Sequence, residues 1–453
     1  MSSISGRLVD GRTGLITAVR PDDPRHRYLR SHSAFTAHVA DTSRFATWRA
    51  DPCGHGSALD NPDAARAAAV GEALERYCGN IEPTSLTRAS FRELRESGHN
   101  ALDPAQAAPY SASQYETPGF PFAPITAEST IAWIPGRDLV ADTQVLVPAC
   151  LVLLNYLPPP GEPTVAQMYA GMAAGTRRGQ AYVSALLELI ERDAMTIWWM
   201  SGAPGTEIDV NSDGRLAAWA TELDEQGTVC RLLWLRTTFG VPVVGAFLHD
   251  TRRGLIAWGA ASRGEPVAAA AKALVEAIDG LLFGVELLDP DARLYTMDGS
   301  AAAYAHPYRP FRADRSYVRS FRDDLRDVSD LASHTQLYLD PEAQQRITHR
   351  FEKPVEIVSL ADMPEIGPDV FLHCVTALER EGVRAIAVDS TSADVAAAGW
   401  HVTRVLAPGL VGYAPAALPL LGGRRLYEVP HLLGWASEPL TEADLVRDPL
   451  PYS

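Results

Sequence analysis

Lysine, closely spaced cysteine and long apolar runs are all scarce in this sequence. Lys272 and Lys353 are the only lysines among 453 residues, and neither lies in a GxxxxGK[ST] motif, which excludes a P-loop. The five cysteines are far apart without a CxxC pair, so we expect no cysteine zinc site and a reduced, cytoplasmic protein. No apolar run reaches the roughly 18 residues that a membrane helix needs, and no signal peptide begins the chain.

The charge balance is acidic. The sequence has 40 Lys and Arg against 56 Asp and Glu, a formal net charge of -16. Such a charge repels nucleic-acid backbones and anionic membranes, so we expect neither as a partner. The hydrophobic fraction of 46% is typical of a globular protein.

Strand-like and helix-like segments are interspersed without βαβ regularity, which favours an α+β fold with mixed or antiparallel sheets. Apolar, β-branched runs predict strands at 14–19, 130–139, 143–157, 230–250, 384–390 and 401–410. Helices are predicted from a cap at Asn61 or Asp63 to about Gly79, around Ser184, over 266–280 and in the polar region 317–343. The glycine-containing stretch 50–63 is interpreted as a loop.

The sequence ExxER occurs twice, each time in a helical segment. Residues at helical spacing share one face of a helix. The later copy places four polar residues on such a face: Ser184, Glu188, Glu191 and Arg192. The earlier copy does the same with Glu72, Glu75 and Arg76.

Two interpretations of these faces are open. Each copy could be a solvated face with an i,i+4 ion pair that contributes about 0.2–0.5 kcal/mol. The later copy, however, is followed by the apolar DAMTIWWM, and two carboxylates near a core repel each other unless a cation lies between them. Magnesium accepts carboxylate oxygens and keeps phosphates and waters as further ligands. The pair of helices therefore predicts a magnesium and nucleotide triphosphate site, with Arg76 and Arg192 contacting phosphates or orienting the glutamates.

A third helix carries Lys272 and Glu276 at i,i+4 spacing. This pair is compatible with a place in the same site, and equally with a surface ion pair.

This ordered set of motifs resembles the YcaO-domain family, and more closely its cyclodehydratase branch, which matures thiazole- and oxazole-containing ribosomal peptides. The resemblance runs from about Gly14 to the end. It rests on GEALERYCG, GMAAGTRRGQAYVSALLELIERDAMTIWW, EPVAAAAKALVEAI, VRAIAVDSTSADVAAAGWHVTRVLAPGL and PLLGGRRLYEVP. It implies a YcaO-type fold with helices lining a central ATP site, a tail at 1–13, the domain at 14–445, and a Pro-containing tail at 446–453 that reaches toward the active site.

The resemblance also implies chemistry. A Cys, Ser or Thr side chain of a precursor peptide attacks the preceding backbone carbonyl, ATP activates the amide oxygen, and loss of phosphate leaves an azoline. The residues implied to contact the nucleotide are Glu72, Glu75, Arg76, Ser184, Glu188, Glu191, Arg192, Lys272 and Glu276. Those implied to bind Mg2+ are Glu72, Glu75, Glu188, Glu191 and Glu276. A homodimer is expected, and either a separate ThiF-like partner delivers the leader peptide or the enzyme reads its substrate alone.

Three departures from the family pattern keep alternatives open. Ala68 replaces a serine four residues before the first glutamate, and His55 replaces a basic residue between the early glycines. The family's terminal PxPxP is here PLPYS, in which we expect Pro449, Pro451 and Ser453 to act in catalysis, with a frayed terminus as the alternative. Amidine formation, thioamide formation and a non-catalytic scaffold subunit therefore remain alternatives to ring formation.

Overall fold

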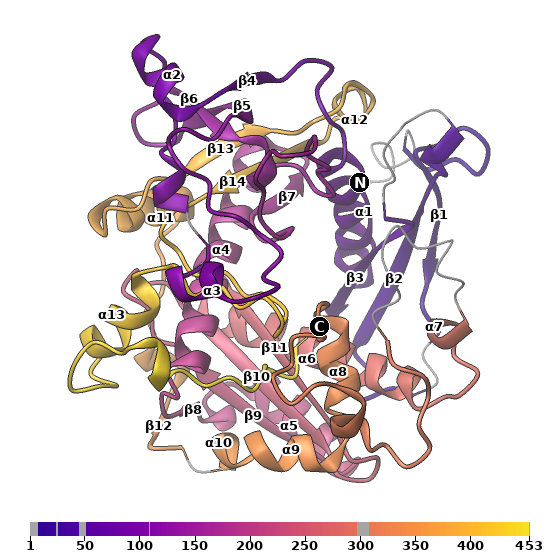
Figure 1. Cartoon of the computed structure of the whole chain (residues 1–453). Coiled ribbons are helices and arrows are strands. Elements are labelled where there is room, and N and C mark those ends of the chain that lie inside the picture. The colour runs from indigo at the N-terminus through magenta and orange to yellow at the C-terminus, as the bar shows by residue number, and fades with distance from the viewer. Residues whose placement is uncertain are drawn as a thin grey trace.

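A computed structural model describes residues 8–23, 26–44, 51–107, 109–296, 308–352 and 354–452, and it shows three sheets with helices packed among them (Figure 1). The first sheet is antiparallel, in the order β1 (Ile16–Pro21), β2 (His32–Val39), β3 (Cys53–Leu59). The second has the order β11 (Leu255–Ser262), β10 (Val243–Asp250), β9 (Thr228–Trp234), β8 (Thr206–Ile208), β12 (Glu356–Val358). The third has the order β4 (Thr87–Ala89), β5 (Ile131–Asp138), β13 (Ile386–Asp389), β14 (His401–Leu406), β7 (Met172–Gly175), with β6 (Gln144–Pro148) beside β5. Because β8 and β12 are parallel and the other strands antiparallel, the predicted α+β class is confirmed.

Three long helices carry the acidic motifs: α1 (Pro62–Gly79), α4 (Arg178–Met200) and α6 (Pro266–Leu287). Shorter helices follow the sheets: α2 (Phe91–Glu96), α3 (Ala112–Glu116), α5 (Gly214–Glu225), α7 (Arg293–Thr296), α8 (Ala332–Leu337), α9 (Pro341–Ile347), α10 (His349–Glu352), α11 (Val370–Arg380), α12 (Ala393–Ala397) and α13 (Arg425–Leu432). The side chain of Asn61, rather than Asp63, caps α1 by accepting a hydrogen bond from the backbone of Ala64. In the described part of the chain, no helix combines the length and the apolarity required to cross a membrane.

The stretch predicted as a loop at 50–63 contains strand β3 instead. A Cβ atom on Gly54 would come within 2.2 Å of the Ala73 nitrogen, and one on Gly56 within 2.1 Å of the Ala69 nitrogen. The two glycines therefore let β3 lie directly on α1, which a residue with a side chain would prevent. Gly54 and Gly56 are two residues apart because alternate residues of a strand lie on the same face, here the face that packs on α1; they do not form a turn.

Two further predictions were wrong in extent. The strand predicted over 143–157 ends at Pro148, because Val152 donates back to the Ala149 carbonyl and closes a turn of 3-10 helix. The helical region predicted over 317–343 is divided into a 3-10 turn, α8 and the start of α9. Side chains of Asp330 and Asp340 accept hydrogen bonds from backbone N–H groups there, and such local acceptors compete with a continuous helix.

The C-terminal half of α4 is buried in the largest core. Its Trp198 stacks on Trp258 of β11 with ring centroids 5.1 Å apart, and its Trp199 stacks on Phe351 of α10. The N-terminal half of the same helix carries the ExxER motif. Aromatic packing at one end thus fixes the position of the acidic residues at the other.

Candidate functional site

The first half of the candidate site lies on α1, beside β3. Arg76 donates from Nη2 to Glu72 Oε1 over 2.9 Å, and the backbone N–H of His55 donates to Glu72 Oε2, also over 2.9 Å. The guanidinium of Arg76 lies 4.1 Å from the ring centre of Tyr169. Glu72 is therefore held from both sides, by an arginine of its own helix and by the strand that the glycines bring close.

Glu75, one turn further along α1, is enclosed. The backbone N–H of Ala174 on β7 donates to its Oε1 over 2.7 Å. Burial, followed by repulsion from Glu72, raises the pKa of Glu75 to about 8, and Glu188 adds to the repulsion. A carboxylate in such surroundings holds its proton more tightly than a free one, and a nearby cation would favour its ionised form.

The second half of the site begins with Glu188 on α4. Its Oε2 accepts a hydrogen bond from the backbone N–H of Gly171 over 3.0 Å, and its Oε1 lies 3.4 Å from Nη2 of Arg192. Gly171 has a φ of +90°, and a Cβ atom there would lie 2.4 Å from the Val405 carbonyl oxygen. Only glycine fits this position, so the turn directly before β7 presents a backbone N–H group to Glu188.

Glu191 is the most deeply buried of the five predicted glutamates, with 4% of its surface exposed. Its Oε1 is paired with Arg192, and its Oε2 accepts from the backbone N–H of Ser262 at the end of β11 over 3.2 Å. Burial raises the pKa of Glu191 to about 8; Arg192 lowers it, and Glu276 and Glu188 raise it further. The acidic residues of α4 and α6 are therefore close enough for their charges to interact, because Glu276 belongs to α6.

On α6, Lys272 Nζ lies 3.4 Å from Glu276 Oε1, so the predicted i,i+4 ion pair is present. One turn beyond Glu276, Asp279 accepts from the Ser57 hydroxyl on β3, and its Oδ1 lies 2.9 Å from His32 Nε2 on β2. Asp279 thereby ties α6 to the first sheet. It was not predicted, although its distance of three residues from Glu276 repeats the spacing within both ExxER motifs.

The C-terminal tail lies against α4 and β11. Residues 449–452 are buried, and the Pro451 carbonyl accepts from the backbone N–H of Trp258 over 2.8 Å. Tyr338 donates from its hydroxyl to the Pro449 carbonyl. The ring centre of Tyr452 lies 5.0 Å from the guanidinium carbon of Arg192, so the tail ends among the acidic residues. A frayed terminus is thus excluded for the residues up to Tyr452, whereas Ser453 lies outside the described residues.

Ser184 is the predicted site residue that stands apart. It lies on α4 one turn before Glu188 and is exposed. Within the described ranges it forms no hydrogen bond or ion pair with the other predicted residues. A ligand could reach it, but the protein itself does not hold it in the cluster.

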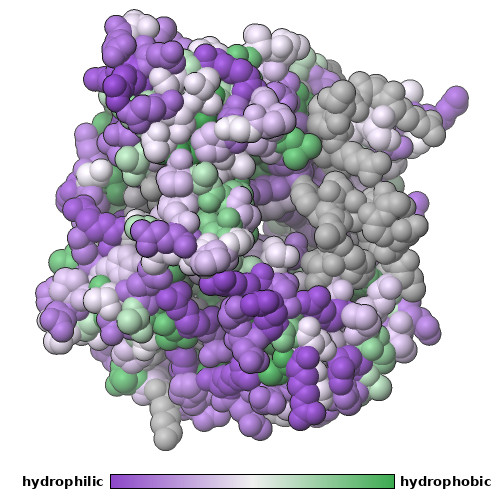
Figure 2. Space-filling view, in the orientation of Figure 1, coloured by the Kyte–Doolittle hydropathy of each residue, from purple (hydrophilic) through white to green (hydrophobic). Residues whose placement is uncertain are grey.

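The residues suit magnesium that arrives with a nucleotide better than a metal cage made by the protein. Among the described residues, no group of three His, Cys, Asp or Glu side chains is close enough to hold a metal ion. Magnesium, however, is commonly bound through one or two carboxylates together with phosphates and waters. Five glutamates, two of them with raised pKa, and two arginines provide that kind of donor set. Figure 2 shows the surface hollowed near the middle of this face, next to where Figure 1 draws α1.

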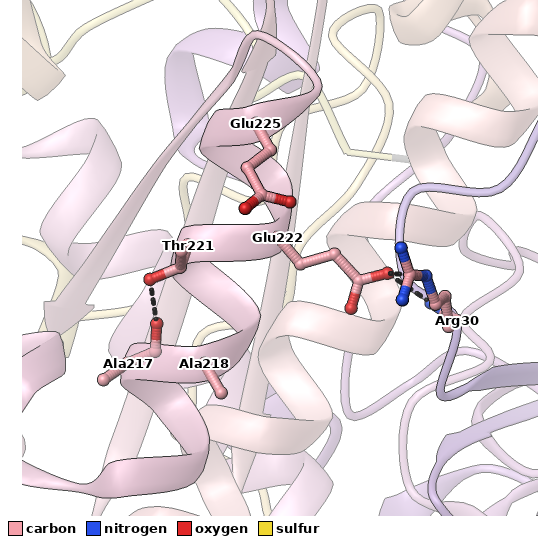
Figure 3. A pocket seen from close by; sticks show the side chains of 6 residues that line it. All are labelled: Arg30, Ala217, Ala218, Thr221, Glu222 and Glu225. Carbon is pink, nitrogen blue, oxygen red and sulfur yellow. Dashed lines mark hydrogen bonds and ion pairs between the residues drawn. The ribbon is translucent and has the colours of Figure 1, made fainter.

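A separate hollow lies away from these residues (Figure 3). It measures about 390 Å³ and is lined by Arg30 and one face of α5, namely Ala217, Ala218, Thr221, Glu222 and Glu225. Arg30 Nε lies 3.7 Å from Glu222 Oε1 across it. Its lining includes none of the predicted site residues, and its exposed single-helix wall offers little to enclose a ligand.

Comparisons with known proteins bear on this arrangement. The profile of a family described as YcaO cyclodehydratase, ATP- and Mg2+-binding, matches residues 56–411. An uncharacterized protein of Methanothermobacter thermautotrophicus is 28% identical over 218 residues, which are 47% of this chain and 53% of that protein. An uncharacterized protein in the tfuA 3' region of Rhizobium leguminosarum bv. trifolii is 27% identical over 265 residues, 54% of this chain and 60% of that protein. The chain therefore spans less than two thirds of either relative.

Solved structures show a shared fold. A heterocyclase in complex with substrate and cofactor superposes with a TM-score of 0.74 at 20% identity, over 98% of this chain and 56% of that chain. YcaO from Methanopyrus kandleri bound with AMPPCP and Mg2+ superposes with a TM-score of 0.61 at 18% identity, over 92% of this chain and 94% of that chain. A chain of the E. coli microcin synthetase McbBCD complex with pro-MccB17 bound superposes with a TM-score of 0.54 at 14% identity, over 88% of this chain and 90% of that chain.

Proposed function

The chain belongs to the YcaO family of ATP- and Mg2+-binding cyclodehydratases, and on that premise we propose that it modifies a ribosomally made peptide with ATP and Mg2+. The modification we propose is cyclodehydration of Cys, Ser or Thr to an azoline in natural-product biosynthesis. One observation carries the proposal: Glu75 of α1 and Glu188 of α4 accept hydrogen bonds from Ala174 and Gly171, which are three residues apart. Glu191 of α4 accepts from Ser262 of β11, the strand on which α6 packs, so the acidic residues of the three helices form one group.

The chemistry follows from the weakness of an amide oxygen as a leaving group. The substrate side chain forms a bond to the preceding carbonyl carbon, and the bond between that carbon and its oxygen must then break. When bound, ATP with Mg2+ supplies the phosphoryl group that converts this oxygen into a good leaving group. In balance, the peptide loses one water per ring, and ATP becomes ADP and phosphate.

The chain's own residues would position charge for this reaction. Arg76 and Arg192 are each held by glutamates of their own helix, so they are oriented before a ligand arrives. Glu75 and Glu191 are enclosed, which strengthens their attraction for a cation. On α6, Lys272 partly neutralises the charge of Glu276. On α4, Ser184 precedes Glu188 by one turn and would be a further contact to the nucleotide. We propose the nine nucleotide contacts and five magnesium ligands of the sequence analysis on this basis.

The tail belongs to the same proposal. In the organisation that we propose, 1–13 is an N-terminal tail, 14–445 is the catalytic domain, and 446–453 completes the active site. Pro449 and Pro451 are buried, and they carry the chain to Tyr452 beside Arg192. The next residue is Ser453, for which we propose a role at the reacting peptide.

A peptide substrate and partner subunits also form part of the proposal. One similar structure is a heterocyclase with substrate, and another is a complex of several subunits with pro-MccB17 bound. These support a precursor peptide as substrate and partner subunits; the partner that we propose is a separate, leader-binding, ThiF-like protein. A homodimer remains a prediction.

The test uses the full chain with a candidate precursor rich in Cys, Ser or Thr, ATP and Mg2+. Release of ADP and phosphate should accompany loss of one water mass per ring from the peptide, and both should stop when Mg2+ is chelated. Exchange of oxygen for sulfur would identify a thioamide-forming enzyme, and condensation with an amine an amidine-forming one. Nucleotide binding without turnover, under every partner combination, would identify a scaffold subunit, for which Ala68 and the altered tail are the supporting features.

A further inference from the structure

Ser262, the last residue of β11, has a hydroxyl without a partner at the edge of the acidic group. The residue is 0% exposed, and its Oγ finds no hydrogen-bond partner among the described residues. Its backbone N–H donates to Glu191 Oε2. A buried hydroxyl in this condition is unfavourable unless a ligand or water completes it.

The side chain of Ser262 lies on the face of β11 that is packed against α4. A Cβ atom on Gly259 would approach the Ala273 carbonyl of α6 to 2.3 Å, so that position faces α6. Trp258 instead stacks on Trp198 of α4. Because side chains alternate along a strand, Ser262 shares the face of Trp258 and so faces the helix that carries Glu191.

The neighbouring protein groups are already occupied. Both oxygens of Glu191 accept hydrogen bonds, one from Arg192 and the other from the Ser262 backbone. Arg263, the next residue, donates to the Ser262 carbonyl over 2.7 Å. The Ser262 hydroxyl is therefore unpaired next to Glu191, whose other oxygen is held by Arg192, and its own backbone carbonyl is held by Arg263. A hydroxyl donor with cationic groups on the neighbouring atoms suits an anionic oxygen acceptor.

Resting on the proposed function, we infer that Ser262 is a nucleotide-contacting residue whose hydroxyl donates a hydrogen bond to a phosphate oxygen of ATP. The phosphate completes the donor that the protein leaves unpaired. Arg192 and Arg263 would supply positive charge near the phosphate, and the glutamates would hold the magnesium ion that comes with it. Nothing in the ExxER motifs points to this residue, because it lies on a strand far from them in the sequence.

Thr228 supplies a matched control in the same sheet. Thr228 is 1% exposed, and its Oγ1, like the Ser262 Oγ, has no hydrogen-bond partner among the described residues. The sheet register pairs Ser262 with Val243 at one end of β10, and Thr228 with Asp250 at the other. Removing either hydroxyl removes one buried unpaired group, but only Ser262 adjoins the acidic group.

The experiment titrates the full chain with a non-hydrolysable ATP analogue and MgCl2 by calorimetry, and measures thermal melting without nucleotide. We expect S262A to melt at or above the wild-type temperature while its dissociation constant rises about 10- to 100-fold, the loss of one hydrogen bond to a charged acceptor. S262T should keep wild-type affinity, and T228V should change neither binding nor its magnesium dependence.

Two results would overturn the inference. The first is an S262A variant that binds the analogue like the wild type, which leaves the proposed function intact. The second is an S262A variant that melts well below the wild type, which would show a structural role for the hydroxyl. A wild-type chain that does not bind the analogue at all would instead refute the proposed function, and the inference with it.

Discussion

The ring of Tyr452 covers the guanidinium of Arg192, with the guanidinium carbon 5.0 Å from the ring centre. Arg192 in turn pairs with Glu188 and Glu191 on its own helix. The contact therefore joins the end of the chain to the second ExxER motif, more than 250 residues away in the sequence. It also explains why the tail is buried, because Pro451 hydrogen bonds to the free edge of β11 just before this point.

Tyr452→Ala should unfold more easily than the wild type by roughly 3–5 kcal/mol, the usual cost of deleting a large buried aromatic ring. Its nucleotide turnover should also fall, because Arg192 loses the ring that holds it. Tyr452→Phe keeps the ring and is the matched control. Urea unfolding and ATP turnover measure the two effects; equal turnover in the Ala and Phe variants would separate the tail from the site.

Glu191→Gln should abolish nucleotide turnover while the protein stays folded, since the substitution keeps the side-chain volume and removes the charge. Glu207→Gln is the control, because Glu207 is a largely buried glutamate on β8 that lies outside the acidic helices. Its Oε1 lies 2.8 Å from Nη1 of Arg231 on the neighbouring strand β9, so it too is paired with an arginine. Circular dichroism reports the fold, and phosphate release reports turnover. Undiminished turnover in Glu191→Gln would exclude this residue from the site.

Gly171→Ala should destabilise the protein by at least 1–3 kcal/mol, roughly the cost of a side chain at a left-handed φ, with a clash added. The added Cβ would meet the Val405 carbonyl and displace the N–H group that Glu188 accepts. Gly161→Ala has a similar φ of +89° but open space around it, so it should cost about 1 kcal/mol. Equal unfolding midpoints of the two variants in urea would contradict the close approach at Gly171.

Glu75 and Glu191 should make the free energy of unfolding of the nucleotide-free protein decrease as the pH rises from about 4.5 to about 8. Both carboxyls have folded pKa values raised from 4.5 to about 8, mainly by burial, so the folded state holds protons that the unfolded state has released. Their contribution is complete below the unfolded pKa and is lost as pH passes the folded one. Urea unfolding at pH 5, 6.5 and 8 measures the slope, which should become shallower in Glu191→Gln.

The same pKa values predict that binding of ATP with Mg2+ releases protons near neutral pH, because a cation favours the ionised carboxylates. Calorimetry in two buffers of different ionisation enthalpy counts these protons. Fewer should be released by Glu191→Gln than by the wild type. Proton uptake on binding would contradict the placement of the two enclosed glutamates at the cation.

Local periodicity made part of the site predictable. Glu72 with Glu75, and Glu188 with Glu191, recur at helical spacing, so the sequence predicts both pairs and the helix face of each. The start of the first helix follows from the same local rules, which offered Asn61 or Asp63 as its cap, and the structure has Asn61. The structure agrees with these predictions because helix faces and caps depend on residues within a turn or two of each other.

Contacts between distant segments were not predictable in this way. Gly54 and Gly56 were interpreted as loop glycines, since nothing near them in the sequence shows that α1 would lie against them. Ser262 and Asp279 escaped notice because each reaches the acidic group, or the first sheet, only through packing of β11 and α6.

The sequence by itself determined the three acidic helices, the i,i+4 spacing of their charged residues and the acidic charge of the chain, because these depend on residue type and short-range spacing. Only the tertiary structure decided that the acidic residues of the three helices come together, that Glu191 is buried, and that Tyr452 ends beside Arg192. Those outcomes depend on burial and on long-range packing, which combine segments hundreds of residues apart and which no local pattern encodes.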